Sequence, residues 1–277
     1  MNTDGRTQGA TGRSSRPVGG RIPPGLVIPG AIGLAFLVLP LVGLLIRTPW
    51  STLLERLTRP GILTALRLSL QTATTATIVS VVLGVPLAWL LARVDFPGRK
   101  VVRALVTVPL VLPPVVGGVA LLLAFGRRGL IGSWLDSTFG ITLPFTTTGV
   151  VVAEAFVAMP FLIIAVEGAL RGADTRLEEA AATLGANRWT TFRRVTLPLV
   201  APGVAAGAVL CWARALGEFG ATITFAGNFP GRTQTMPLAV YLALETDLKD
   251  AIVLSLILLI VSVAILVSLR DRWLTAP

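Results

Sequence analysis

The side chains best suited to chemistry in this sequence are a few charges that lie inside apolar segments. Arg214 and Glu218 are four residues apart, and Glu154 lies alone in another apolar stretch. Four-residue spacing on a helix places two side chains on one face, so Arg214 and Glu218 are able to pair. Charges at membrane depth usually face a protein interior or a water path. The pair is therefore either a structural ion pair or part of a gate, and Glu154 is either a buried partner or, as we favour, a shallow surface residue.

Histidine and cysteine, on which many catalytic and metal sites depend, are absent or nearly absent. The sequence has no histidine, and Cys211 is its one cysteine. This excludes His-dependent triads, His-ligated metals and an intramolecular disulfide. A serine protease within the membrane needs a base beside its serine, and an aspartyl protease needs two Asp at membrane depth. Every Asp here lies outside the apolar segments, so an intramembrane enzyme is disfavoured.

The chain also lacks the phosphate-binding loop that is typical of ATP-hydrolysing subunits. A phosphate-binding loop ends in Gly-Lys-Ser/Thr after a glycine and four intervening residues. The only two lysines, Lys100 and Lys249, are followed by Val101 and Asp250. We therefore expect no cofactor on this chain, and any nucleotide chemistry belongs to another polypeptide.

The composition is that of a membrane protein. Of the 277 residues 53% are apolar and 14% are charged, whereas soluble chains average about 25% charged. The net charge of +10 would suggest nucleic acid in a soluble protein. Here the basic residues fall between long apolar runs, so we interpret them as topology signals and expect no nucleic-acid partner.

Six apolar runs are long enough to cross a bilayer, which takes about 20 helical residues. The predicted spans are residues 25–46, 68–92, 104–125, 149–166, 199–222 and 251–269. We expect residues 1–24 to be a flexible tail, 25–270 to be the membrane domain and 271–277 to be a short second tail.

The basic residues predict the orientation. With the N-terminus inside, fifteen lie in cytoplasmic segments and seven in outer segments, while Arg67 and Arg214 lie at membrane depth. The positive-inside rule then places both termini in the cytoplasm. The longest cytoplasmic loop is residues 167–198.

The third predicted span carries several helix breakers. It contains Pro109, Pro113 and Pro114, followed by Gly117 and Gly118. Mid-helix prolines remove backbone hydrogen bonds and bend the helix. Such bends are tolerated where a helix lines a cavity or packs on protein. Pro113 and Pro114 are therefore either a packing kink, the interpretation we favour, or part of a gate.

The cytoplasmic loop is patterned as a pair of helices. Thr175 and Glu178 have capping-box spacing, and Gly185 lies where a helix end needs a left-handed residue. Asn187 is placed to cap a second helix, and Ala180 and Ala181 permit close approach of another surface. From spacing alone this element is either a docking element or an amphipathic helix on anionic lipid.

A motif in the loop favours docking. Glu179-Ala180-Ala181, Gly185 after three residues, and Val195-x-Leu197-Pro198 after nine more resemble the signature loop of ABC importer permeases, with Val195 in place of the usual Ile. In that family the loop, with Glu178 at its start, is a coupling helix that fits a cleft in the ATPase subunit. The resemblance implies an all-α fold of the type I ABC importer permease class, with six spans and the coupling helix between spans four and five.

The outer half of the fifth span points to one branch of that family. The run from Ala213 to Thr222, which includes Phe219, and the later stretch from Pro237 to Tyr241 resemble the sulfate/molybdate permeases, and within them the molybdate and tungstate members.

The resemblance implies a non-catalytic subunit of an ATP-driven oxyanion importer in the bacterial plasma membrane. Its partners would be a second copy of itself, an ATPase dimer that binds ATP and Mg, an extracytoplasmic binding protein, the oxyanion and lipid. Pro113, Pro114, Arg214, Glu218, Phe219 and Thr222 would line or gate the path. The alternatives are a sulfate/thiosulfate permease and an ATP-independent secondary transporter, which lacks visible inverted repeats here.

Overall fold

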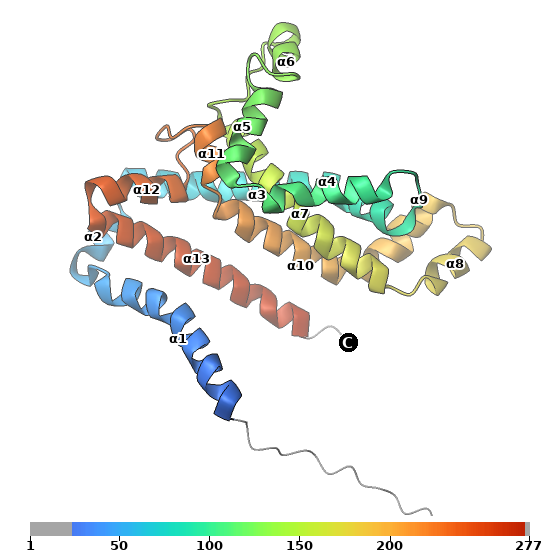
Figure 1. The fold of residues 1–277 in the computed structure, drawn as a ribbon, viewed down its shortest axis with the longest axis horizontal. Helices are drawn as coiled ribbons and strands as arrows, with labels where there is room; N and C mark the ends of the chain where they lie inside the picture. Colours follow the sequence, from blue (N-terminus) through green and yellow to red (C-terminus); the bar gives the residue numbers. More distant parts are fainter. Residues whose placement is uncertain (1–23, 275–277) are drawn as a thin grey trace, which may run out of the picture. The chain divides into compact units, whose positions relative to one another are not determined.

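In the computed structural model, residues 24–274 are described, and all regular elements within that range are helices (Figure 1). The predicted N-terminal tail lies outside it except for Pro24, whereas residues 271–274 of the predicted second tail are the end of α13, and only 275–277 lie outside the described residues. The elements are α1 (Pro24–Arg47), η1 (Trp50–Thr52), α2 (Leu53–Leu57), α3 (Pro60–Arg93), α4 (Arg99–Val111), α5 (Pro114–Phe125), α6 (Gly132–Phe139), α7 (Thr147–Gly172), α8 (Arg176–Thr183), α9 (Arg188–Thr191), η2 (Phe192–Thr196), α10 (Leu197–Leu216), α11 (Gly220–Phe225), α12 (Met236–Thr246) and α13 (Leu248–Leu274).

The chain divides into two compact units, residues 1–46 and 47–277. The described part of the first unit is α1, an apolar helix with a mean hydropathy of 2.4 that contains Pro29 and Pro40. Its length and composition are those of a membrane span.

The core of the second unit is formed by α3, α7 and α10, which pack on one another. Its buried side chains are mostly small or aliphatic, among them Ala73, Ala88, Leu162 and Ala215. Small residues let helix backbones approach closely, which is the usual basis of helix association in membranes. Gly203 shows how close: a Cβ built on it would lie 2.4 Å from Ala169 Cβ.

A second cluster joins the start of α3 to the pair formed by α12 and α13. Ile62 and Ala65 of α3 pack with Met236 of α12 and Leu254 of α13. The backbone N–H of Met236 also donates to Ser69 Oγ at 2.7 Å, which fixes the start of α12 on α3.

Five helical stretches of residues 24–274 have the length and hydropathy of a membrane span. They are Gly25–Arg47, Pro60–Arg93, Thr147–Gly172, Arg188–Leu216 and Leu248–Ile265. These correspond to the predicted spans one, two, four, five and six.

The third predicted span, 104–125, is not one continuous helix. It is divided between α4, which ends at Val111, and α5, which begins at Pro114. Leu112 has an extended backbone, with φ −69° and ψ 129°, because a proline disfavours the helical conformation of the residue before it. The sequence predicted a bend at this place, and the structure has a break.

The fifth predicted span, 199–222, also ends earlier than expected. Helix α10 stops at Leu216, and a short helix, α11, follows from Gly220 to Phe225. Helices α11 and α5 pack side by side (Figure 1).

Candidate functional site

The loop that the sequence places in the cytoplasm, residues 167–198, contains α8, α9 and the π-helical turn η2, which runs directly into α10. The side chain of Asp174 caps α8, since its Oδ1 accepts a hydrogen bond from the Arg176 N–H at 2.9 Å. Thr175 makes no capping bond, and its backbone is already helical. The predicted capping box of Thr175 and Glu178 is therefore wrong, because the neighbouring carboxylate takes the capping role.

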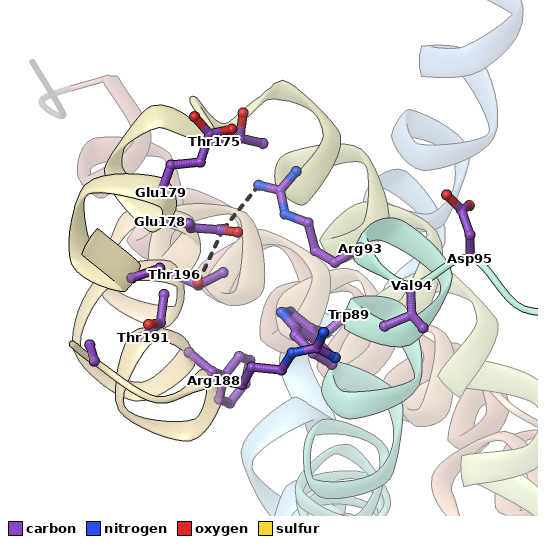
Figure 2. A pocket seen from close by; sticks show the side chains of 13 residues that line it. Trp89, Arg93, Val94, Asp95, Thr175, Glu178, Glu179, Arg188, Thr191 and Thr196 are labelled. Atoms are coloured by element: carbon purple, nitrogen blue, oxygen red, sulfur yellow. Dashed lines mark hydrogen bonds and ion pairs between the residues drawn. The ribbon is translucent and has the colours of Figure 1, made fainter. Parts of the chain in front are cut away.

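Glu178 instead holds the loop element onto the membrane domain. Its Oε1 lies 3.1 Å from Arg93 Nη2 at the end of α3 and accepts a hydrogen bond from Thr196 Oγ1 at 3.1 Å. Figure 2 shows both interactions meeting at this one carboxylate. One side chain therefore connects α3, α8 and η2, and Glu178 acts here as a brace.

The turn between α8 and α9 has the predicted form. Gly185 adopts φ +84°, the left-handed conformation that favours glycine. The N–H of Ala186 donates to Ala181 O and that of Gly185 to Ala182 O, each at 3.0 Å, which is the Schellman pattern. Asn187 caps α9 by accepting from the Thr190 N–H at 2.8 Å, as predicted.

One side of α8 is left open. Leu177 is 51% exposed and Leu184 is 88% exposed, and Glu179, Ala180 and Gly185 are exposed beside them. We call these five residues the α8 surface. Exposed leucines beside alanine and glycine, on an element braced from behind, are typical of a surface that another protein covers.

The remaining motif residues join the loop to α10. Thr196 is buried, and Val195 and Leu197 are half-buried. Leu197 packs against the main core, and Pro198 lies in the first turn of α10, directly after the π-helical turn. The motif thus combines exposed residues on α8 with anchoring residues at α10.

A cavity of about 590 Å³ lies between α8 and the end of α3, with Arg93, Glu178 and Arg188 among its lining residues. Figure 2 looks into it. A second brace stands nearby on α7, where Glu167 Oε1 pairs with Arg103 of α4 at 2.7 Å and with Arg171 at 2.6 Å. These ion pairs tie the helix ends of this face together.

The predicted pathway residues gather where α5 meets α11. A Cβ on Gly220 would lie 2.7 Å from Pro114 Cβ, and one on Gly118 would lie 2.5 Å from Thr224 Cβ. Only glycine permits this approach, so α5 and α11 are packed backbone to backbone. The break at Pro113 and the break after Leu216 therefore lead into two segments that touch each other.

Arg214 and Glu218 form the predicted pair. Arg214 Nη1 lies 2.6 Å from Glu218 Oε2, and the Glu218 side chain is 1% exposed while that of Arg214 is 27% exposed. Glu218 Oε1 also accepts from the Ala221 N–H at 2.8 Å. The carboxylate therefore holds the end of α10 to the start of α11, which is a structural role.

Phe219 and Thr222 lie beside this pair on the same segment. The Phe219 ring is 5.2 Å from that of Tyr241 on α12. Thr222 is fully buried, and its Oγ1 has no hydrogen-bond partner within the described protein.

Glu154 is buried, contrary to our expectation. It is 1% exposed on α7, and Thr72 Oγ1 of α3 donates to its Oε1 at 2.9 Å. The threonine-rich pattern of α3 was visible in the sequence, but the partner of Glu154 was not, because the two residues are 82 positions apart.

An ion-pair cluster at the ends of the spans was not predicted. Arg56 of α2 pairs with Asp247 at 2.8 Å and also with Asp250, and Arg59 pairs with Asp250 at 2.6 Å. The hydrogen bond from Arg56, followed by that from the Lys249 N–H, lowers the pKa of Asp247 below its usual range. The cluster connects the start of the second unit to the junction of α12 and α13. Within residues 24–274, no group of His, Cys, Asp or Glu is arranged to hold a metal.

The chain is similar to known proteins over the region that holds the broken helices and the braced loop element. The profile of the family described as "binding-protein-dependent transport system inner membrane component" matches residues 80–276. The chain belongs to this family. The match includes the loop element, α5 and α11, so the features described above lie in the family's shared domain.

Individual relatives of this permease family extend the match. The chain is 47% identical over 251 residues to the molybdenum transport system permease protein ModB of Mycobacterium tuberculosis, covering 91% of this chain and 95% of that protein. It is 37% identical to the sulfate transport system permease protein CysT of Escherichia coli, covering 90% and 93%. A bacterial ABC transporter that imports alginate, an acidic polysaccharide, has a similar fold, with a TM-score of 0.73, 18% identity and coverage of 90% and 93%.

Proposed function

We propose that this chain is the permease subunit of an ATP-driven molybdate importer. The observation that carries the proposal is the graded similarity to named relatives: 47% identity to a molybdenum permease against 37% to a sulfate permease, each over nearly the whole chain. Tungstate has the same charge and shape as molybdate, so the permease should pass both. Sulfate is the second candidate, since the CysT relative is also matched over most of its length.

The proposed topology has six crossings and both termini in the cytoplasm. Five crossings are the spans of sufficient length and hydropathy, and the sixth is the uncharged second half of α4, residues 104–111, followed after Leu112–Pro113 by the short apolar helix α5. A helix broken at membrane depth is tolerated when it packs on protein, and α5 packs on α11. Six crossings place both termini on the same side of the membrane. With the termini in the cytoplasm, the excess of basic residues lies on the cytoplasmic side, as the positive-inside rule requires.

The α8 surface would dock onto the ATPase subunit. Its apolar side chains are exposed, and the element beneath them is braced by Glu178 and by the Schellman turn at Gly185. A movement of the ATPase would then be transmitted through η2 into α10 without being absorbed by a flexible loop. This supports a mechanical connection, in which closure of two ATPase subunits on ATP brings two α8 elements together.

Two copies of the chain would form the path between them. In each copy α5 and α11 follow a helix break and are packed too closely to move independently. They would shift as one body when α10 moves, opening the path alternately to each side. An extracytoplasmic binding protein would deliver the oxyanion, and it would set most of the selectivity.

The substrate is tested by competitive uptake. Cells in which the gene is deleted and then restored are given labelled molybdate together with unlabelled tungstate or sulfate. Molybdate uptake should depend on the gene and be reduced by tungstate more strongly than by sulfate. Gene-dependent uptake of sulfate that molybdate does not reduce would show the sulfate permease instead.

The coupling role is tested by substitution in the α8 surface. Gly185→Asp and Glu179→Lys should abolish binding of the ATPase subunit, and with it transport-linked ATP hydrolysis, while the chain still inserts in the membrane. Glu55→Lys, on the exposed face of α2, makes the same charge change away from α8 and should leave ATPase binding intact. Full transport-linked hydrolysis by both α8 variants would contradict the assignment. Molybdate accumulation by this chain alone in liposomes would show an ATP-independent transporter.

A further inference from the structure

An apolar groove of about 310 Å³ lies where the end of α3 meets α9 and η2. Its lining residues are Pro86, Trp89, Leu90, Arg188, Trp189 and Phe192. The only charged one is Arg188, at one edge of an otherwise hydrocarbon and aromatic wall. None of the five residues of the α8 surface lines this groove, although Trp89, Arg188 and Phe192 also line the 590 Å³ cavity beside α8, so the groove and that cavity adjoin.

Three aromatic rings form the wall. Trp189 stacks on Phe192, with ring centroids 5.8 Å apart, and Phe192 meets Trp89 edge to face at 5.9 Å. Trp189 is nonetheless 67% exposed. Tryptophan is enriched at the level of lipid headgroups, where its ring has one apolar and one hydrated side. Trp89 lies four residues before the end of α3, at the depth where that level is expected.

The edge of the groove is basic, and its charges are not neutralised by nearby carboxylates. Arg188, Arg193 and Arg194 are exposed on α9 and η2, and none of them forms an ion pair with an acidic side chain of residues 24–274. Arg93 and Arg103, at the same end of the molecule, are both neutralised by glutamates. Figure 2 shows the Arg188 side chain extending toward Trp89. The local charge therefore favours an anion that also has an apolar part.

We propose that this groove binds an anionic phospholipid of the cytoplasmic leaflet. An acyl chain would lie along Trp89, Leu90 and Phe192, and the phosphate would meet Arg188 while the glycerol region lies against Trp189. A free inorganic anion would gain nothing from the apolar wall, and a zwitterionic lipid would gain less from the arginines. The placement in the cytoplasmic leaflet rests on the proposed topology, but the binding of lipid requires neither the ATPase nor molybdate.

The test uses the tryptophans as reporters in the full chain. The protein is placed in phosphatidylcholine vesicles that contain an equal mole fraction of either brominated phosphatidylglycerol or brominated phosphatidylcholine, since bromine quenches nearby tryptophan. The anionic lipid should quench more strongly. Arg188→Gln should lower its apparent affinity about fivefold, since one arginine near an anionic surface contributes about 1 kcal/mol. Arg128→Gln makes the same charge change at an exposed residue of another loop and should leave the affinity unchanged.

A second pair of variants locates the reporter. Trp189→Phe keeps an aromatic ring in the groove and should remove much of the additional quenching, whereas Trp134→Phe, at a 54% exposed residue of α6, should not. If Arg188→Gln does not fold, wild-type protein decides the question by competition: unlabelled phosphatidylglycerol should relieve the quenching, and inorganic phosphate should not. Equal quenching by the two brominated lipids, or relief by inorganic phosphate alone, would overturn the proposal.

Discussion

Adding one methyl group at Gly203 should separate α10 from α7. A Cβ at this position would lie 2.4 Å from Ala169 Cβ and 3.8 Å from Ala169 Cα. Carbon atoms in favourable contact are about 3.5–4.0 Å apart. The two helices would therefore have to move apart by more than about 1 Å, and no side-chain rotation relieves the clash because both atoms are fixed to their backbones.

The loss of stability follows from the cost of overpacking a well-packed interior. Extra methyl groups in well-packed interiors typically cost about 1–3 kcal/mol, so Gly203→Ala should lower the free energy of unfolding by that amount. Gly168→Ala is the matched control, because Gly168 is also within a helix of this pair but a Cβ added to it would meet no other atom within 4 Å. It should leave stability unchanged or raise it slightly, since alanine is the better helix former.

The assay is reversible unfolding in mixed micelles with increasing SDS, followed by circular dichroism. A double-mutant cycle completes it, since Ala169→Gly removes the methyl group that the new one would strike. The double variant should regain most of the stability lost in Gly203→Ala, with a coupling of at least about 1 kcal/mol. A single variant as stable as the wild type, or a double variant with no recovery, would refute the packing argument.

Three further outcomes follow from the ion pairs. Because Arg56 lowers the pKa of Asp247, this pair stabilises the protein above the carboxylate's ordinary pKa of about 4, and its contribution is lost as the pH falls through the lowered value. Acid unfolding below about pH 4 should therefore be steeper in the wild type than in Arg56→Gln, as measured by the pH dependence of stability. Glu178→Ala should lower the midpoint of thermal unfolding more than Glu179→Ala, because Glu178 contacts residues of two other helical segments whereas Glu179 is exposed. Equal midpoints would contradict the bracing role of Glu178. Arg214→Gln should lower the free energy of unfolding in the SDS assay more than Glu218→Gln does. The first variant leaves the carboxylate of Glu218, which is 1% exposed, without its cation, whereas the second leaves Arg214, which is 27% exposed. The reverse order would show that the pair is solvated.

The local features of the loop that contains α8 and α9 could be predicted from its sequence. Gly185 and Asn187 act through their own backbone conformation and their nearest neighbours, so their roles are visible in a short window. The Arg214–Glu218 pair is also local, since one turn of helix brings the two side chains together. The family signature then gave the loop its expected role, which no spacing argument could have supplied.

The features that the sequence did not reveal depend on partners far away in the chain. Glu154 and Thr72 are 82 residues apart, and Arg56 and Asp247 are 191 apart, so neither pair is visible before the helices are assembled. The break at Leu112 is a matter of degree: two consecutive prolines predict distortion, and in the structure Leu112, the residue before Pro113, is extended and separates α4 from α5. Thr175 failed as a cap because the helix begins one residue earlier: Asp174 accepts from the Arg176 N–H, and the Thr175 backbone is already helical.

The π-helical turn at Phe192–Thr196 changes the directions in which the helical segments before and after it face. It accommodates one more residue than an α-helical turn, and each residue of an α-helix advances the azimuth by about 100°. The wall formed by Trp189 and by Phe192, the first residue of the turn, is thereby rotated relative to the seam that Gly203 and Gly207 present to α7 after it. In an uninterrupted α-helix of the same length, residues 189 and 192 would lie on the same side as residues 203 and 207, and wall and seam would compete for that side.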